Sequence, residues 1–96
     1  MEFSELPIFF KRRFDEKIFK RTLFRNMEFW VNENRLNFRE FETNVINETV
    51  FGYFASQHRV EIYNGEIPIG DVYEFEDFVL KKYGSLMREY WLNNRY

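Results

Sequence analysis

The 96-residue chain contains no cysteine, and it has only four glycines and two prolines. Without cysteine it can have no disulfide framework, no cysteine-ligated metal site and no thiol nucleophile. The glycines are isolated from one another, which excludes a glycine-rich loop that cradles phosphate groups. No run approaches the roughly 18–20 consecutive apolar residues of a membrane-spanning helix. We therefore expect no cofactor, no metal and no membrane contact.

Histidine occurs once, at His58. A lone histidine is more often a surface residue than part of a catalytic triad, whose members are assembled in space. Asp71, Glu74 and Asp77 recur every three residues, but carboxylates in a first helical turn usually compensate the helix dipole and seldom form a metal site. The sequence therefore predicts a protein that is not an enzyme.

Length and composition predict a single compact domain spanning residues 1–96. The chain has 14 basic and 16 acidic residues, and 45% of its residues are apolar, which excludes a disordered chain. The first five residues have neither the basic nor the apolar region of a secretory signal. The expected location is therefore the cytoplasm. For a protein encoded by a virus, this is the cytoplasm of the host cell.

Aromatic residues are abundant: 13 Phe, 6 Tyr and 2 Trp make up 22% of the chain. Each aromatic side chain can bury roughly 150–250 Å². One interpretation is a core filled with phenylalanine. The other is that the chain has more aromatic residues than it can bury, which leaves some to contact a partner.

The predicted fold is α+β. Apolar residues alternate with polar ones on both sides of Asn64-Gly65, which predicts a β-hairpin over residues 59–70. An Asp-x-x-Glu capping box at Asp71 then opens an amphipathic helix of about 20 residues. The N-terminal 25 residues also have the apolar spacing of a helix.

Alternating apolar residues over 27–41 predict a second hairpin, and β-branched residues favour a strand over 49–55. Residues 42–57 as a whole are ambiguous between strand and helix. The resulting architecture has an N-terminal helix and a small antiparallel sheet of about three to five short strands. The long C-terminal helix is expected to pack on this sheet.

Charge is segregated along the chain. Lys11–Arg25 carries a net charge of +5, and Glu61–Asp77 carries −6. The two segments could face each other, remain solvated, or bind partners of opposite charge. On a single helix, five of the basic residues share an arc of about 140° that also holds Phe10 and Phe14. These five candidates for nucleic-acid binding are Arg13, Lys17, Lys20, Arg21 and Arg25.

A second apolar stripe follows the predicted C-terminal helix beside its core-facing residues, and it consists of Tyr73, Leu80 and Trp91. Together the two stripes span about 160°, which is wider than one core requires. The N-terminal segment could cover the second stripe; otherwise, with Gly84 alongside, it forms an interface to a partner or to a second copy. The predicted protein-interface residues are Tyr73, Glu74, Asp77, Leu80, Trp91, Glu61 and Glu66.

These features favour a non-catalytic protein-binding module that acts as an inhibitor, adaptor or assembly factor. Small cysteine-free chains rich in Phe, Asn and Glu are typical of products that phages and other mobile elements direct against host enzymes. The expected target is then a host nucleic-acid-processing protein, bound through an acidic, aromatic surface; a homodimer is a second possibility. The alternative function is nucleic-acid binding through Lys11–Arg25.

Overall fold

The computed structural model describes residues 3–33, 35–55 and 69–94, and these ranges contain helices and no strand. In chain order the elements are the 3-10 turn η1 (Phe3–Glu5), α1 (Ile8–Arg13), α2 (Glu16–Trp30), α3 (Phe38–Val50), the π-helical turn η2 (Phe51–Ala55) and α5 (Ile69–Asn94). The predicted α+β fold is therefore wrong for the described part of the chain.

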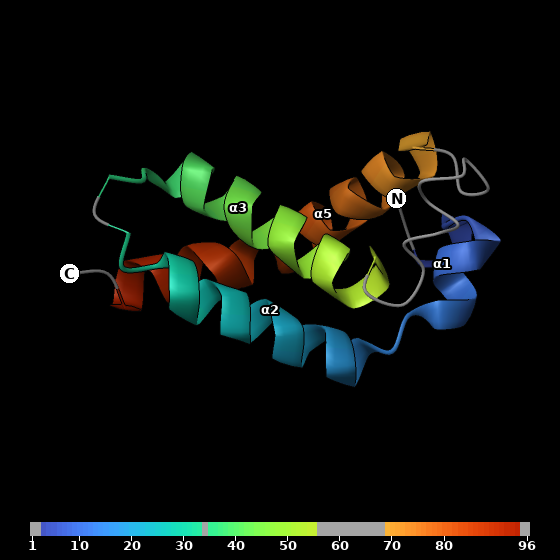
Figure 1. Ribbon diagram of the computed structural model, residues 1–96, viewed down its shortest axis with the longest axis horizontal. Helices are drawn as coiled ribbons and strands as arrows, with labels where there is room; N and C mark the ends of the chain where they lie inside the picture. Colours follow the sequence, from blue (N-terminus) through green and yellow to red (C-terminus); the bar gives the residue numbers. More distant parts are fainter. Residues whose placement is uncertain (1–2, 34, 56–68, 95–96) are drawn as a thin grey trace.

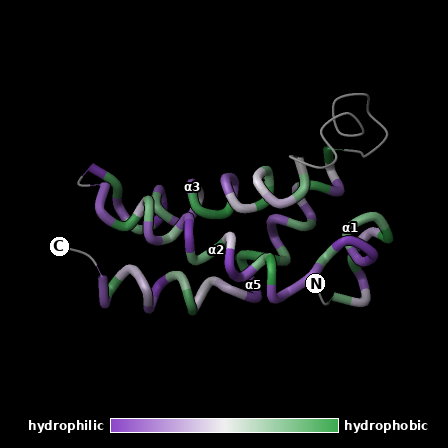
Figure 2. Tube along the Cα trace, turned by 60° about the horizontal axis from the view of Figure 1, so that its bottom comes forward, coloured by the Kyte–Doolittle hydropathy of each residue, from purple (hydrophilic) through white to green (hydrophobic). Residues whose placement is uncertain are grey.

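Three long helices form the body of the protein. Helices α2 and α3 run side by side in opposite directions, α5 lies behind them, and α1 covers the end at which α2 and α5 begin (Figure 1). Polar and apolar residues alternate along each helix in Figure 2. None of the helices in the described ranges has the length and apolarity needed to cross a bilayer.

An aromatic cluster forms one end of the core. The fully buried ring of Phe75 lies at its centre, and rings from α1, α2, η2 and α5 surround it. The ring centroids of five neighbours lie 4.9–5.8 Å from that of Phe75: Phe10, Phe14, Phe19, Phe54 and Phe78. Such pairs stabilise a fold by roughly 0.5–1.5 kcal/mol beyond the burial of their area. Much of the aromatic excess is thus used to build the core.

The predicted N-terminal helix is interrupted between α1 and α2. The Asp15 carboxylate caps α2 by accepting hydrogen bonds from the backbone N–H groups of Lys17 and Ile18, at 3.1 and 3.3 Å. The Tyr53 hydroxyl of η2 accepts from the Asp15 backbone N–H at 2.7 Å and donates to the Arg13 carbonyl at 2.9 Å. This tyrosine therefore satisfies backbone groups on both sides of the break.

The predicted hairpin over 27–41 is wrong because the apolar residues follow the period of a helix and not the two-residue alternation of a strand. Met27 and Val31 are both buried and lie one helical turn apart, whereas Phe29 between them is 65% exposed. Helix α3 then begins at a capping box, in which the Asn37 side chain and the Glu40 backbone N–H pair at 2.8 Å.

The strand predicted over 49–55 is also wrong. Thr49 and Val50 end α3, and η2 follows directly. The buried Thr49 hydroxyl accepts a hydrogen bond from the Asn26 side chain of α2 at 3.0 Å, and Val45, Ile46 and Val50 of α3 pack into the core. Here tertiary packing outweighs β propensity, which is a weak and context-dependent preference.

The predicted C-terminal helix is present as α5, but it packs on α2 and α3 and not on a sheet. It begins at Ile69, so Asp71 lies in its first turn and does not open the helix. Of the hairpin predicted over 59–70, residues 59–68 lie outside the described residues.

The aromatic cluster can be tested by truncating its central ring. We expect Phe75→Ala to lower the free energy of unfolding by about 3–5 kcal/mol, because it leaves a cavity in a close-packed region. The control is Tyr73→Ala on the same helix, where the side chain is 63% exposed and the loss should stay within about 0.5 kcal/mol. Urea denaturation followed by circular dichroism measures both. An equal loss of unfolding free energy in the two variants would contradict the central role of Phe75 in the core.

A polar contact joins the start of α2 to the middle of α5. The hydroxyl of Tyr83, whose ring is buried, donates to Glu16 Oε1 at 3.3 Å, and Lys82 Nζ lies 3.6 Å from the same oxygen. Burial raises the pKa of Tyr83 well above its ordinary value of 10.0, and the charge of Glu16 and this hydrogen bond add to the effect. The folded protein thus holds the phenolic proton more tightly than the unfolded chain.

This contact predicts a loss of stability at alkaline pH. Above about pH 10 the unfolded tyrosine ionises while folded Tyr83 keeps its proton, so the free energy of unfolding falls as the pH rises. Tyr83→Phe should reduce this dependence between about pH 8 and pH 11. At neutral pH it should cost about 0.5–1.5 kcal/mol. Thermal denaturation across this range measures the effect, with exposed Tyr73→Phe as the control; parallel pH profiles for wild type and Tyr83→Phe would refute it.

Candidate functional site

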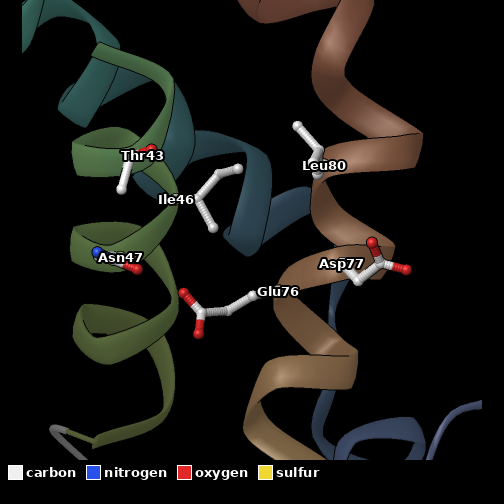
Figure 3. Close-up of a pocket in the computed structure, with 6 residues that line it drawn as sticks. All are labelled: Thr43, Ile46, Asn47, Glu76, Asp77 and Leu80. Carbon is white, nitrogen blue, oxygen red and sulfur yellow. The ribbon is translucent and has the colours of Figure 1, made fainter. Parts of the chain in front are cut away.

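A shallow groove of about 290 Å³ lies between α3 and α5 (Figure 3). Its lining residues, which define the α3–α5 groove, are Thr43, Ile46, Asn47, Glu76, Asp77 and Leu80. Figure 3 shows the side chains of Ile46 and Leu80 turned toward each other, with Glu76 reaching toward α3 and Asp77 pointing away from it. The groove therefore has an apolar centre with carboxylates at one end.

Helical spacing places these side chains together. Ile46 comes three residues after Thr43 on α3, and Leu80 comes four after Glu76 on α5, so each set lies on one face of its helix. Ile46 is 7% exposed and Leu80 is 38% exposed. The apolar centre thus has a covered base on α3 and an open edge on α5.

The two carboxylates of the groove differ in environment. Glu76 is half-buried, and burial raises its pKa above the ordinary value of 4.5. No other described residue forms a hydrogen bond or an ion pair with it. Asp77 is exposed and pairs with Lys81 at 3.0 Å, an i,i+4 contact that adds little stability in water. Glu76 therefore carries a desolvation cost that a cationic partner could offset.

Beyond the groove, α3 and α5 close around Trp91. This indole is only 5% exposed, and its ring centroid lies 4.9 Å from that of Phe41 and 6.1 Å from that of Phe38. The guanidinium of Arg88 lies 4.8 Å from the Phe38 ring centroid. The prediction of Trp91 as an accessible interface residue is wrong, because α3 covers this end of the second apolar stripe.

The other predicted interface residues have mixed positions. Tyr73, at the opposite end of the stripe, is 63% exposed. Glu74 is exposed on α5 but does not line the groove. A Cβ at Gly84 would meet only the Leu80 side chain, at 3.9 Å, so no described backbone requires glycine there. Glu61 and Glu66 lie outside the described residues.

The structure separates the five predicted nucleic-acid-binding residues. Lys17, Arg21 and Arg25 share the solvent side of α2, and none of them forms an ion pair with another described residue. Lys20 is exposed but lies about 100° round the helix from Arg21. Arg13 belongs to α1, where its guanidinium lies 4.0 Å from the Phe9 ring centroid.

The aromatic residues predicted to accompany these cations do not lie among them. Phe10 is fully buried and Phe14 packs against the core, because the helix breaks between α1 and α2. The apolar side chains exposed on the solvent side of α2 are instead Ile18 and Phe29, at 49% and 65%. We call the surface formed by these two residues and the three cations of α2 the α2 outer face.

Sequence reasoning missed four residues of the groove: Thr43, Ile46, Asn47 and Glu76. The three on α3 escape prediction because the sequence leaves residues 42–57 ambiguous between strand and helix. The Asn-x-x-Glu pattern at Asn37 was the signal that would have placed a helix there. Glu76 was counted in the acidic segment, but its neighbours on α3 were not known.

The groove is suited to binding. Its lining combines aliphatic side chains, a threonine, an asparagine and two carboxylates, without a nucleophile–base pair among these described residues. No three Asp, Glu or His side chains in the described ranges are placed to hold a metal ion. His58 lies outside these ranges.

Comparisons of the chain with protein-family models, with curated proteins and with solved structures gave no match. The functional argument therefore rests on the geometry and charge of the two surfaces.

The burial of Glu76 predicts a specific effect on stability. Burial raises the pKa of Glu76 in the folded protein above the ordinary 4.5, so ionising this carboxyl costs more in the folded protein than in the unfolded chain. Glu76 therefore contributes less to the free energy of unfolding at pH 7 than at acidic pH. Glu76→Gln should raise the free energy of unfolding at pH 7 by up to about 0.5 kcal/mol and leave it unchanged near pH 4. The control is Glu89→Gln at an exposed position of α5. Denaturation at both pH values tests this, and a loss of stability at pH 7 would contradict it.

Proposed function

We propose that the protein is a non-catalytic protein-binding module that holds a basic, amphipathic segment of a partner protein in the α3–α5 groove. The observation that carries the proposal is the half-buried Glu76 carboxylate beside the apolar pair Ile46 and Leu80. This combination fits a segment with an apolar side chain and a lysine or arginine one helical turn apart.

The charge around the groove supports a basic partner. Helix α3 carries three glutamates against one arginine, and residues 69–80 of α5 carry four carboxylates and no basic residue. A field of one sign steers an oppositely charged partner and disfavours acidic competitors. Exposed Tyr73, seven residues before Leu80, extends the surface by two turns of α5 and can contact a cationic side chain through its ring.

Such a module would act as an inhibitor, adaptor or assembly factor. An acidic surface of this kind can occupy a basic patch that otherwise receives a phosphate backbone. The proposal therefore keeps the predicted class of target, a nucleic-acid-processing protein, and replaces Trp91 by the groove as the site of contact. The evidence for this target remains the distribution of charge.

Nucleic-acid binding through Lys11–Arg25 remains the alternative. Lys17, Arg21 and Arg25 share one exposed face, which favours it, but Arg13 is directed to Phe9 on α1 and Lys20 lies to one side. Phosphate contacts dominate such binding, and each one lost weakens it. The α3–α5 groove is the better supported site because charge, shape and apolar surface coincide there.

The groove can be tested with a designed peptide. The probe is a fluorescein-labelled helical peptide with leucines on one face and flanking lysines and arginines. We expect it to bind, and Glu76→Lys to weaken binding by about tenfold or more, because one attractive contact becomes repulsive. Leu80→Glu should have a similar effect. Fluorescence anisotropy at about 50 mM and 200 mM salt measures the affinities, which should fall with salt.

Two controls show whether the effect is specific to the groove. Glu89→Lys makes the same charge change at an exposed position of α5 that does not line the groove, and it should leave the affinity within about twofold. A second peptide has the same leucines with glutamate in place of each basic residue, and it should not bind. Equal weakening by Glu76→Lys and Glu89→Lys would reduce the interaction to non-specific charge attraction and refute the groove.

A further inference from the structure

We infer that the protein associates with itself, the α2 outer face of one copy occupying the α3–α5 groove of the next. This inference rests on the proposed function, because it names one segment that the groove would accept. It is carried by the complementary charge and apolar surface of two faces of the same chain.

The α2 outer face has the chemistry expected of a groove occupant. Ile18 and Phe29 are 49% and 65% exposed, and Lys17, Arg21 and Arg25 lie between and beside them within an arc of about 120°. The same side of α2 also carries one carboxylate, Glu28, so cations remain in excess. Exposed apolar side chains among cations are typical of a surface that docks on an acidic, apolar one.

The two surfaces lie on opposite sides of the molecule. Phe19, Leu23 and Met27 turn the inner side of α2 to the core, so its outer face points away from α3 and α5. The α3–α5 groove lies between the other two long helices, and the ribbon of α2 passes behind them in Figure 3. A chain therefore cannot place its own α2 outer face in its own groove, and the contact must join two copies.

The spacing of the side chains allows a parallel register between α2 of one copy and α5 of the next. Arg25 precedes Phe29 by four residues, and Glu76 precedes Leu80 by four, which corresponds to about 6 Å along each helix. With Phe29 against Leu80, Arg25 meets Glu76. In this register Arg21 lies about 12 Å before Phe29 along α2, and Tyr73 lies about 10.5 Å before Leu80 along α5. Arg21 therefore comes close to Tyr73.

This contact joins two different surfaces, so it leaves one groove and one α2 outer face free in every dimer. Such heterologous contacts form rings if their rotation closes and open chains if it does not. The number of copies in the assembly should therefore increase with protein concentration and decrease as salt screens the charges.

Mixing two variants tests the inference. In the first variant, Arg21→Ala, Arg25→Ala and Phe29→Ala remove contacts of the α2 outer face without adding charges that a basic groove would attract; in the second, Glu76→Lys and Asp77→Lys block the groove. Each variant alone should remain at the monomer mass of 12.0 kDa. An equimolar mixture should form a dimer and stop there, because only one competent groove and one competent α2 outer face can meet. Sedimentation equilibrium measures the masses, and circular dichroism confirms that both variants are folded.

The wild-type protein should show an average mass that rises between about 10 µM and 1 mM protein, with association weakened at least tenfold between about 50 mM and 500 mM salt. The matched control, Arg12→Glu with Glu89→Lys, changes two exposed charges outside both surfaces and should associate like the wild type.

Three outcomes would overturn the inference. These are a wild type that is monomeric throughout, a variant that still associates alone, as a symmetric dimer through one surface would give, or a mixture that remains monomeric. If the wild type is monomeric and binds labelled single-stranded DNA, and if Arg21→Glu with Arg25→Glu abolishes this binding, the α2 outer face is assigned to nucleic acid. Where self-association fails, the first variant and the basic leucine peptide separate the two proposals. If this variant binds the peptide, the groove function stands; if it does not, both proposals fail.

Discussion

The packing of aromatic rings around Phe75 is the constraint on which the rest of the structure depends. Rings from α1, α2, η2 and α5 meet there, and α1 and η2, with six and five residues, are too short to be stable helices alone in water. Their helical faces are stabilised by tertiary burial. Because these inner faces are committed to the core, the surface available for binding is restricted to the outer faces and the grooves between helices.

This arrangement converts segregation of charge along the sequence into segregation in space. The basic segment supplies the outer side of α2, while the acidic start of α5 lies beside the glutamate-rich α3. Charges of opposite sign thus occupy opposite sides of one small protein. Between described residues, no ion pair joins these two segments. The ion pair of α2 with α5 joins Glu16 to Lys82, which follows the acidic segment, and both residues are exposed outside the two binding surfaces.

The sequence predicts the C-terminal helix well because its core-facing residues recur with a clear helical period over many turns. It does not predict α3, whose β-branched residues favour a strand by propensity alone. The unusually broad apolar arc of α5 was the signal in the sequence that a further helix packs on it. The arc is wide because α5 packs on two helices. The sequence predicts Trp91 as a partner contact because it also predicts a hairpin, and no covering helix, for the residues that pack on this indole.

The hydrogen bonds of Tyr53 have a consequence for the order in which the chain folds. The cap that Asp15 provides to α2 is local, since it joins residues two and three positions apart. The orientation of α1, in contrast, depends on Tyr53 bonds that span 38 and 40 residues. Contacts between distant residues carry the entropic cost of closing a long loop, so they form after local ones. We therefore expect α1 to dock after α2 and α3 have paired and brought Tyr53 to the start of α2.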